Sequence, residues 1–164
     1  MGVLPEGPFS QAPLCDGVVI DLPDRLPVLD RGTHTEGSGQ VCSMEAASWL
    51  AGEKWSDHPQ AVHRAIASVA RWVNDAVDDE ERQTLWPLIL ASLDTGTSHN
   101  LRLDTHLRHL TRKAGCKAAL SGRPVQAWIE VLNEHARMTG HSSPPVPPVL
   151  LSELSEHLAT SAGS

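Results

Sequence analysis

The side chains that could do chemistry gather in one part of this 164-residue sequence, between Asp30 and Pro59. Histidine, cysteine and carboxylate residues follow one another there at close spacing: His34, Glu36, Cys42, Glu45, Glu53, Asp57 and His58. A loop with three glycines, Arg31–Gln40, leads into a helical pattern that starts at Val41. Backbone N–H groups converge where a loop enters a helix, and the helix dipole favours negative charge there. We therefore expect any site to lie in this segment.

Nucleophilic or hydrolytic chemistry is one interpretation. A thiol in the first turn of a helix can have its pKa lowered below the usual ~8.5, which would make Cys42 a nucleophile. Glu45 follows on the same helix face, three residues later. With His34 or His58 as the base and Asp57 as the group that orients it, the catalytic candidates are Cys42, Glu45 and Asp57.

A metal site is the second interpretation. Cysteine and histidine are typical zinc ligands, so the candidate ligands are His34, Cys42 and His58, with zinc as the candidate cofactor. Glu45 or Asp57 would then polarise a bound water. The spacing of these residues matches no standard zinc finger. In a third interpretation, the loop and the helix end bind an anion or a polar ligand without chemistry.

Each of these residues also has a structural interpretation. Cys42 can be a small buried residue, and Glu45 can be the N3 member of a capping box. Asp57 is an ordinary N-cap residue, and His58 can lie at the surface. On this view the segment only braces the fold, and the protein is a non-catalytic protein–protein interaction module of phage or mobile-element type.

Geometry separates these alternatives. A helix from Val41 to Ala51 would hold its two ends roughly 16 Å apart, at ~1.5 Å per residue. The loop before it and the turn Gly52–Pro59 after it therefore meet only if one of them folds back along the helix, which the glycines permit.

The charge balance points to protein partners. A net charge of −7 and a pI near 5.6 disfavour nucleic acid and anionic membranes. One stretch opposes this balance, with five bases against the single acid Asp104: Arg102, Arg108, Arg112, Lys113 and Lys117. The simplest interpretation is a solvated helix face. A basic helix on an acidic body also suits a protein partner.

Several absences indicate a cytoplasmic protein. The three cysteines, Cys15, Cys42 and Cys116, are widely spaced and form no CxxC pair, so no disulfide framework is indicated. The N-terminus lacks the basic and apolar regions of a signal peptide. No run approaches the ~18 apolar residues of a membrane-spanning helix.

The pattern along the chain predicts a mainly α fold: an irregular bundle of about five helices, with an extended N-terminal arm and at most two short strands. Residues 1–30 are the arm, with Gly17–Pro23 and Leu26–Asp30 as candidate strands. Residues 31–140 are the helical domain. Residues 141–164 contain a proline-rich linker and a short C-terminal helix, Leu150–Leu158.

Capping residues, glycines and prolines place the helices of the central domain. The expected helices run from Val41 to Ala51, from Pro59 onward, from Asp78 to Gly96 with a kink or fresh start at Pro87, from Ser98 to Ala114 with Gly115 as the stop, and from Pro124 to Gly140.

Three motifs resemble those of small uncharacterised actinobacterial and actinophage proteins. They are Gly32–His34 (Gly-x-His), Cys42–Ala46 (Cys-x-Met-Glu-Ala) and Gly52–Pro59 (Gly-Glu-x-Trp-Ser-Asp-His-Pro). The resemblance covers roughly Leu29–Thr95, includes Asn74-Asp75 and leaves out the C-terminal third. It implies membership of that family but no activity.

Overall fold

The computed structural model describes residues 27–97 and 100–140, which form a mainly helical fold. The longer helices are α1 (Ser43–Leu50), α2 (Arg64–Ala76), α4 (Trp86–Ser92), α5 (Leu101–Ser121) and α6 (Pro124–Thr139). Shorter elements are α3 (Asp79–Arg82) and the 3-10 turns Gln83–Leu85 and Thr95–Thr97. Strands β1 (Val28–Leu29) and β2 (Gln40–Val41) pair in parallel. The predicted fold class is confirmed.

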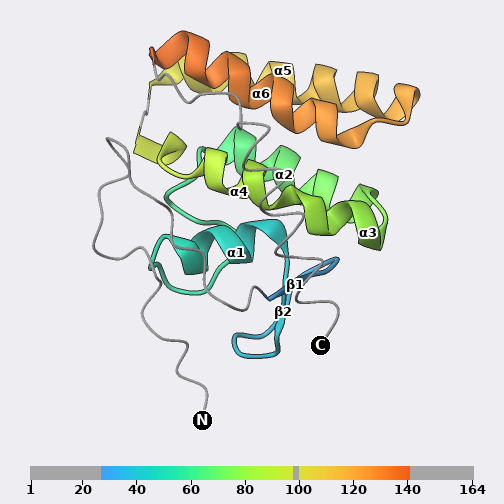
Figure 1. The fold of residues 1–164 in the computed structure, drawn as a ribbon. Helices are drawn as coiled ribbons and strands as arrows, with labels where there is room; N and C mark the ends of the chain where they lie inside the picture. The colour runs from blue at the N-terminus through green and yellow to red at the C-terminus, as the bar shows by residue number, and fades with distance from the viewer. Residues whose placement is uncertain (1–26, 98–99, 141–164) are drawn as a thin grey trace.

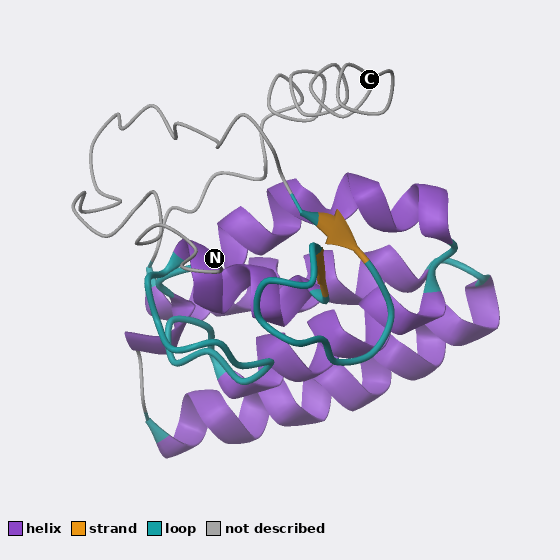
Figure 2. Ribbon diagram, turned by 90° about the horizontal axis from the view of Figure 1, so that it is seen from below, coloured by secondary structure: helices purple, strands orange, loops and turns teal. Residues whose placement is uncertain are grey.

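The helices stack in levels, as Figure 1 shows. α5 and α6 form a hairpin at the top, α2 packs beneath both, and α4 lies beside α2 and packs against α1. The two strands and the loop between them lie on the opposite side from α5, in front of the helices in Figure 2. Two fully buried tryptophans, Trp86 and Trp128, anchor the core, and the Trp128 indole donates a hydrogen bond to Ser92 Oγ at 2.9 Å.

α5 is longer than predicted. Gly115 does not end the helix, which continues to Ser121 and stops at Gly122 with φ at 68°. Ala114 and Ala118 are buried and continue the apolar stripe of Leu103 and Leu107. This packing outweighs the ~1 kcal/mol by which a mid-helix glycine disfavours a helix relative to alanine.

Other predicted boundaries differ from the observed ones by a few residues at the ends of helices. Val41 belongs to β2 instead of to a helix, and the helix expected from Pro59 begins only at Arg64. Pro87 does mark a fresh start, because it lies in the first turn of α4. Asp78 caps α3 as expected, accepting a hydrogen bond from the Glu81 N–H at 2.8 Å.

Some predicted elements lie outside the described residues: the candidate strand Gly17–Pro23, the proline-rich linker and the helix Leu150–Leu158. In the part of the chain that the structure describes, no helix has both the length and the apolar character to cross a membrane.

Candidate functional site

Cys42 lies directly before α1 and caps its N-terminus. Its Sγ accepts a hydrogen bond from the Glu45 N–H at 3.4 Å, and Glu45 Oε2 accepts one from the Cys42 N–H at 2.8 Å. This reciprocal pair is a capping box in which cysteine takes the place that Ser or Thr usually fills. The cap satisfies two of the N–H groups that a helix N-terminus leaves without partners.

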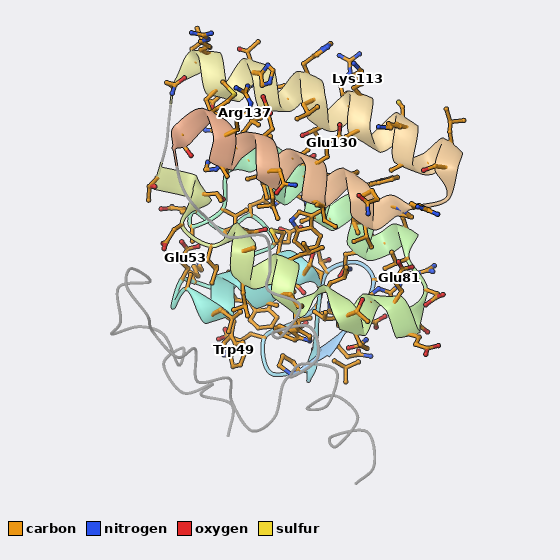
Figure 3. The ribbon with its side chains drawn as sticks, turned by 45° about the horizontal axis from the view of Figure 1, so that its top comes forward. Trp49, Glu53, Glu81, Lys113, Glu130 and Arg137 are labelled. Atoms are coloured by element: carbon orange, nitrogen blue, oxygen red, sulfur yellow. The ribbon has the colours of Figure 1, made fainter. Side chains whose placement is uncertain are left out.

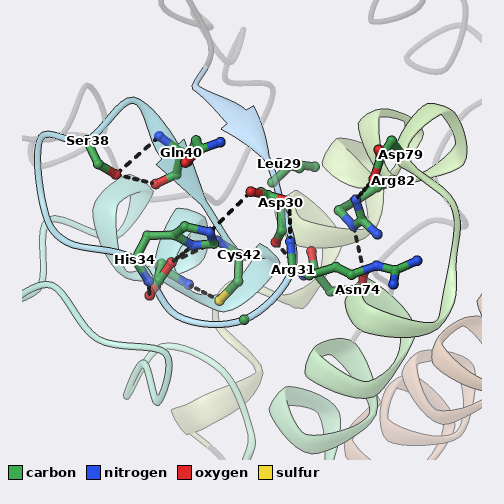
Figure 4. A network of polar contacts seen from close by, with 12 residues as sticks. Leu29, Asp30, Arg31, His34, Ser38, Gln40, Cys42, Asn74, Asp79 and Arg82 are labelled. Atoms are coloured by element: carbon green, nitrogen blue, oxygen red, sulfur yellow. Dashed lines mark hydrogen bonds and ion pairs between the residues drawn. The ribbon is translucent and has the colours of Figure 1, made fainter.

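Glu45 also holds the loop that precedes α1. Its Oε1 accepts a hydrogen bond from the His34 backbone N–H at 2.7 Å, and its Oε2 lies 3.0 Å from His34 Nδ1. The other ring nitrogen of His34 lies 3.6 Å from Asp30 Oδ2. Figure 4 shows these two side chains facing each other. Glu45 is only 2% exposed, and both oxygens of this buried carboxylate accept hydrogen bonds from the protein itself.

The turn after α1 folds back along the helix and meets this loop. The Trp55 indole N–H donates a hydrogen bond to the His34 carbonyl at 3.0 Å, and the Ser56 N–H donates one to Ser48 Oγ at 3.2 Å. Gly52, with φ at 70°, starts the reversal in a conformation that favours glycine. Loop and turn therefore meet through Trp55, which was not among the predicted site residues.

The thiol of Cys42 is protonated at neutral pH. The residue is 3% exposed, and burial raises the pKa of the thiol from 9.0 to about 12. The hydrogen bond from the Glu45 N–H opposes the rise, while the negative charges of Glu45 and Asp57 add to it. The expected lowering of the pKa at a helix N-terminus is therefore wrong for Cys42, because burial outweighs the helix end.

Asp57 and His58 form a second pair, nearer the surface. His58 Nδ1 lies 2.6 Å from Asp57 Oδ1, and the His58 side chain is 69% exposed. In residues 27–97 and 100–140, no three His, Cys, Asp or Glu side chains are grouped so that they could hold a metal ion. The candidate ligands His34, Cys42 and His58 accordingly do not make such a group.

A buried histidine outside the predicted segment links α2 to α5. Nδ1 of His63 accepts a hydrogen bond from the Ala65 N–H at 3.1 Å and caps α2, while Nε2 lies 2.6 Å from Asp104 Oδ1. Since Nδ1 accepts, Nε2 is the nitrogen that donates to the carboxylate. The only acid of α5 is thus turned toward α2.

The opposite side of α5 carries only basic charge. We call its exposed residues the outer face: Leu101, Arg102, Thr105, Arg108, His109, Arg112, Lys113, Cys116, Lys117, Ala119 and Leu120. Figure 3 shows Lys113 projecting away from the helices beneath it. Within the described part of the chain, none of the five Arg and Lys side chains of this face has a hydrogen bond or an ion pair.

Two features border the outer face. On the α6 side, Glu134 contacts His106 Nε2 at 2.8 Å and Arg137 Nε at 2.9 Å, and these contacts, Arg137 first, lower the pKa of Glu134 to about 2. At the N-terminal end of α5, a shallow and mainly apolar depression is lined by Leu101, Arg102, Thr105, His106 and His109.

No protein-family model matches this chain, and neither a curated protein nor a solved structure matches it. The resemblance to small actinobacterial and actinophage proteins stays a prediction.

Proposed function

We propose that this protein is a non-catalytic interaction module that binds an acidic segment of a partner protein through the outer face of α5. One observation carries the proposal: α5 has five bases and one inward-turned acid, whereas the rest of the chain has eight bases and nineteen acids. A concentrated patch of one sign on a body of the other sign favours the approach of a partner of complementary charge in one orientation.

The exposed apolar residues of this face support the same proposal. Leu101 is 82% exposed and Leu120 is 91% exposed, one at each end of a helix about 30 Å long. Arginine is enriched at protein interfaces, and the fully buried core of an interface is more apolar than the rest of a protein surface. Because the face is mostly charged, we expect moderate affinity that weakens with salt.

A ligand, metal or hydrolytic site in residues 30–59 has less support. Both oxygens of Glu45 accept hydrogen bonds from the protein, and the Cys42 thiol is protonated and buried. Chemistry at this place would first have to break the cap of α1. Nucleic acid is also disfavoured, since the net charge of −7 repels a phosphate backbone at long range.

The test uses a fluorescein-labelled glutamate-rich peptide and fluorescence anisotropy. We expect saturable binding that weakens at least about tenfold between low and physiological salt. The double variant Arg108→Glu, Arg112→Glu should abolish binding, because it reverses two charges at the centre of the outer face. The matched control is Arg64→Glu, Arg123→Glu, which reverses two exposed arginines outside this face and should leave most of the binding intact.

Either of two results would overturn the proposal. One is the absence of saturable binding at low salt. The other is an equal loss of binding in the two double variants, which would show that the peptide senses overall charge and not the outer face.

A further inference from the structure

Resting on the proposed function, we infer that the occupant of the outer face is an amphipathic acidic helix, not an extended acidic chain. Its apolar side chains would lie against Leu101 and Leu120, and its carboxylates would meet the arginines between them. The inference starts from the order of residues along the face, which is apolar at both ends and basic in the middle.

The spacing of the face suits a helix. Leu101 and Leu120 lie about 28 Å apart along the axis at ~1.5 Å per residue, which is the length of a partner helix of about five turns. An extended chain would cover the same distance with about eight or nine residues. A helix thus brings more carboxylates to the face, since it places about twice as many residues over the same length.

The surface relief of the face also suits a helix. Residues at i, i+4 spacing form two exposed ridges: one is made by Leu101, Thr105, His109, Lys113 and Lys117, and the other by Arg108, Arg112, Cys116 and Leu120. A groove between such ridges accepts the ridge of a second helix. The shallow depression beside Leu101 lies between the first ridge and the neighbouring residues Arg102 and His106, and it offers a place for one apolar side chain of the partner.

The basic charge of the outer face disfavours a symmetric dimer formed through α5. Two copies that met face to face through α5 would bring ten bases together without an acid, so this symmetric dimer is disfavoured. A polyanion such as nucleic acid would satisfy the bases but would leave Leu101 and Leu120 in water. An acidic helix with an apolar residue near each end matches both kinds of side chain.

Two peptides of identical composition test the inference. The first places glutamates and two leucines on one face of a 22-residue helix, with the leucines about 28 Å apart as on α5. The second is a scrambled sequence without a common face. We expect the first to bind at least about tenfold more tightly and to gain helical circular dichroism on binding, each tenfold step being equivalent to 1.4 kcal/mol.

Variants of the protein assign the effect to the leucines. Leu101→Ser, Leu120→Ser should lower the affinity for the first peptide to that for the second, and both side chains are exposed enough for folding to be unaffected. Val28→Ser, which changes an exposed apolar residue in β1 at 56% exposure, is the matched control and should change nothing. Arg108→Glu, Arg112→Glu should weaken both peptides alike.

Each alternative outcome is distinct. If both peptides bind equally and neither becomes helical, the helical partner is refuted and the proposed function stands. If neither peptide binds, both proposals fail. Tighter binding of a single-stranded oligonucleotide than of either peptide would overturn both. Self-association of the protein alone that disappears in Leu101→Ser, Leu120→Ser would assign the face to a second copy.

Discussion

Two regions of the molecule are rich in polar side chains, residues 30–59 and the outer face of α5, and they differ in whether those side chains have partners within the protein. In residues 30–59 the polar groups face one another. Glu45 accepts hydrogen bonds from both His34 and Cys42, and the Trp55 indole N–H donates one to the His34 carbonyl. On the outer face of α5 the charged groups point to solvent, and the structure gives them no partner among the described residues.

The difference shows why residue type alone does not identify a site. A His, a Cys and a Glu within one loop-to-helix junction are the components of a catalytic centre, but here they satisfy the backbone N–H groups of that junction. Five bases along a helix are usually only a solvated face. They become informative here because Asp104, the one acid of α5 itself, is turned toward His63.

The largest expected effect is a difference in thiol reactivity between the two regions. At pH 8 we expect iodoacetamide to alkylate Cys42 at least ~10³-fold more slowly than the exposed Cys116, because a pKa raised from 9.0 to about 12 lowers the thiolate fraction by about that factor. Mass spectrometry of the tryptic peptides over time gives both rates. In urea the two rates should converge.

Comparable alkylation rates of Cys42 and Cys116 in the folded protein would contradict the contrast between a buried thiol in residues 30–59 and an exposed one on the outer face. They would mean that the N-terminus of α1 opens readily, and the nucleophile hypothesis for Cys42 would regain its support.

The second effect is the loss of stability when Glu45 is truncated. Glu45→Ala should lower the free energy of unfolding by about 2–4 kcal/mol, since it removes half of the capping box and leaves the buried N–H of Cys42 and the partly buried N–H of His34 without acceptors. Urea unfolding followed by circular dichroism measures the change. Glu45→Gln, which keeps one acceptor oxygen, should fall between.

Glu36→Ala is the control, because Glu36 is an exposed acid of the same loop. It should change the stability by no more than about 0.5 kcal/mol. A Glu45→Ala variant as stable as this control would show that the carboxylate is not needed for the fold, and would reopen a functional role for it.

Much of the fold followed from local signals that the structure confirms. Asp78 as a cap, Pro87 as a helix start and Gly140 as a helix end all act within a few residues of their own position. Gly115 was misjudged because the evidence against a helix stop lies outside the local sequence, in the packing of Ala114 and Ala118. Tertiary packing overrides intrinsic propensity in such cases.

The contacts between the loop before α1 and the turn after it were harder to predict, because they join residues that are distant in sequence. Glu45 as the N3 member of a capping box was among the alternatives, since such a box acts within three positions, but the structural interpretation of Cys42 was a small buried residue and not the N-cap. The contact of Trp55 with the His34 carbonyl and that of Asp104 with His63 span 21 and 41 positions. One sequence shows no signal for such pairs, and they decide which side chains stay exposed.

A third, smaller effect concerns the helix that carries the outer face. Gly115→Ala should raise the free energy of unfolding by about 0.5–1 kcal/mol, because glycine is a poor residue inside a helix and a Cβ at this position meets nothing within 4 Å. Thermal unfolding measures the gain. Binding of the acidic peptide should not change, so the variant separates the stability of α5 from the charge it presents.

A destabilised Gly115→Ala variant would show that the backbone of α5 is irregular at this position. The two ridges of the outer face would then not run in register past Gly115, and the proposed seat for a partner helix would be weakened.

The smallest effect comes from the border of the outer face, where a carboxylate is paired with cations. Glu134→Gln should lower the free energy of unfolding at pH 7 by a few tenths of a kcal/mol up to about 1, as is usual for ion pairs near the surface. The pKa of Glu134 is lowered from 4.5 to about 2 in the folded protein, so the stability it contributes is complete above 4.5 and is lost as the pH falls toward 2. The difference between wild type and variant, measured by urea unfolding, should therefore shrink between pH 5 and pH 3.

Glu130→Gln is the control, because Glu130 is an exposed acid of the same helix. An equal change in stability in both variants would show that the pair of Glu134 with Arg137 is not the cause of the effect.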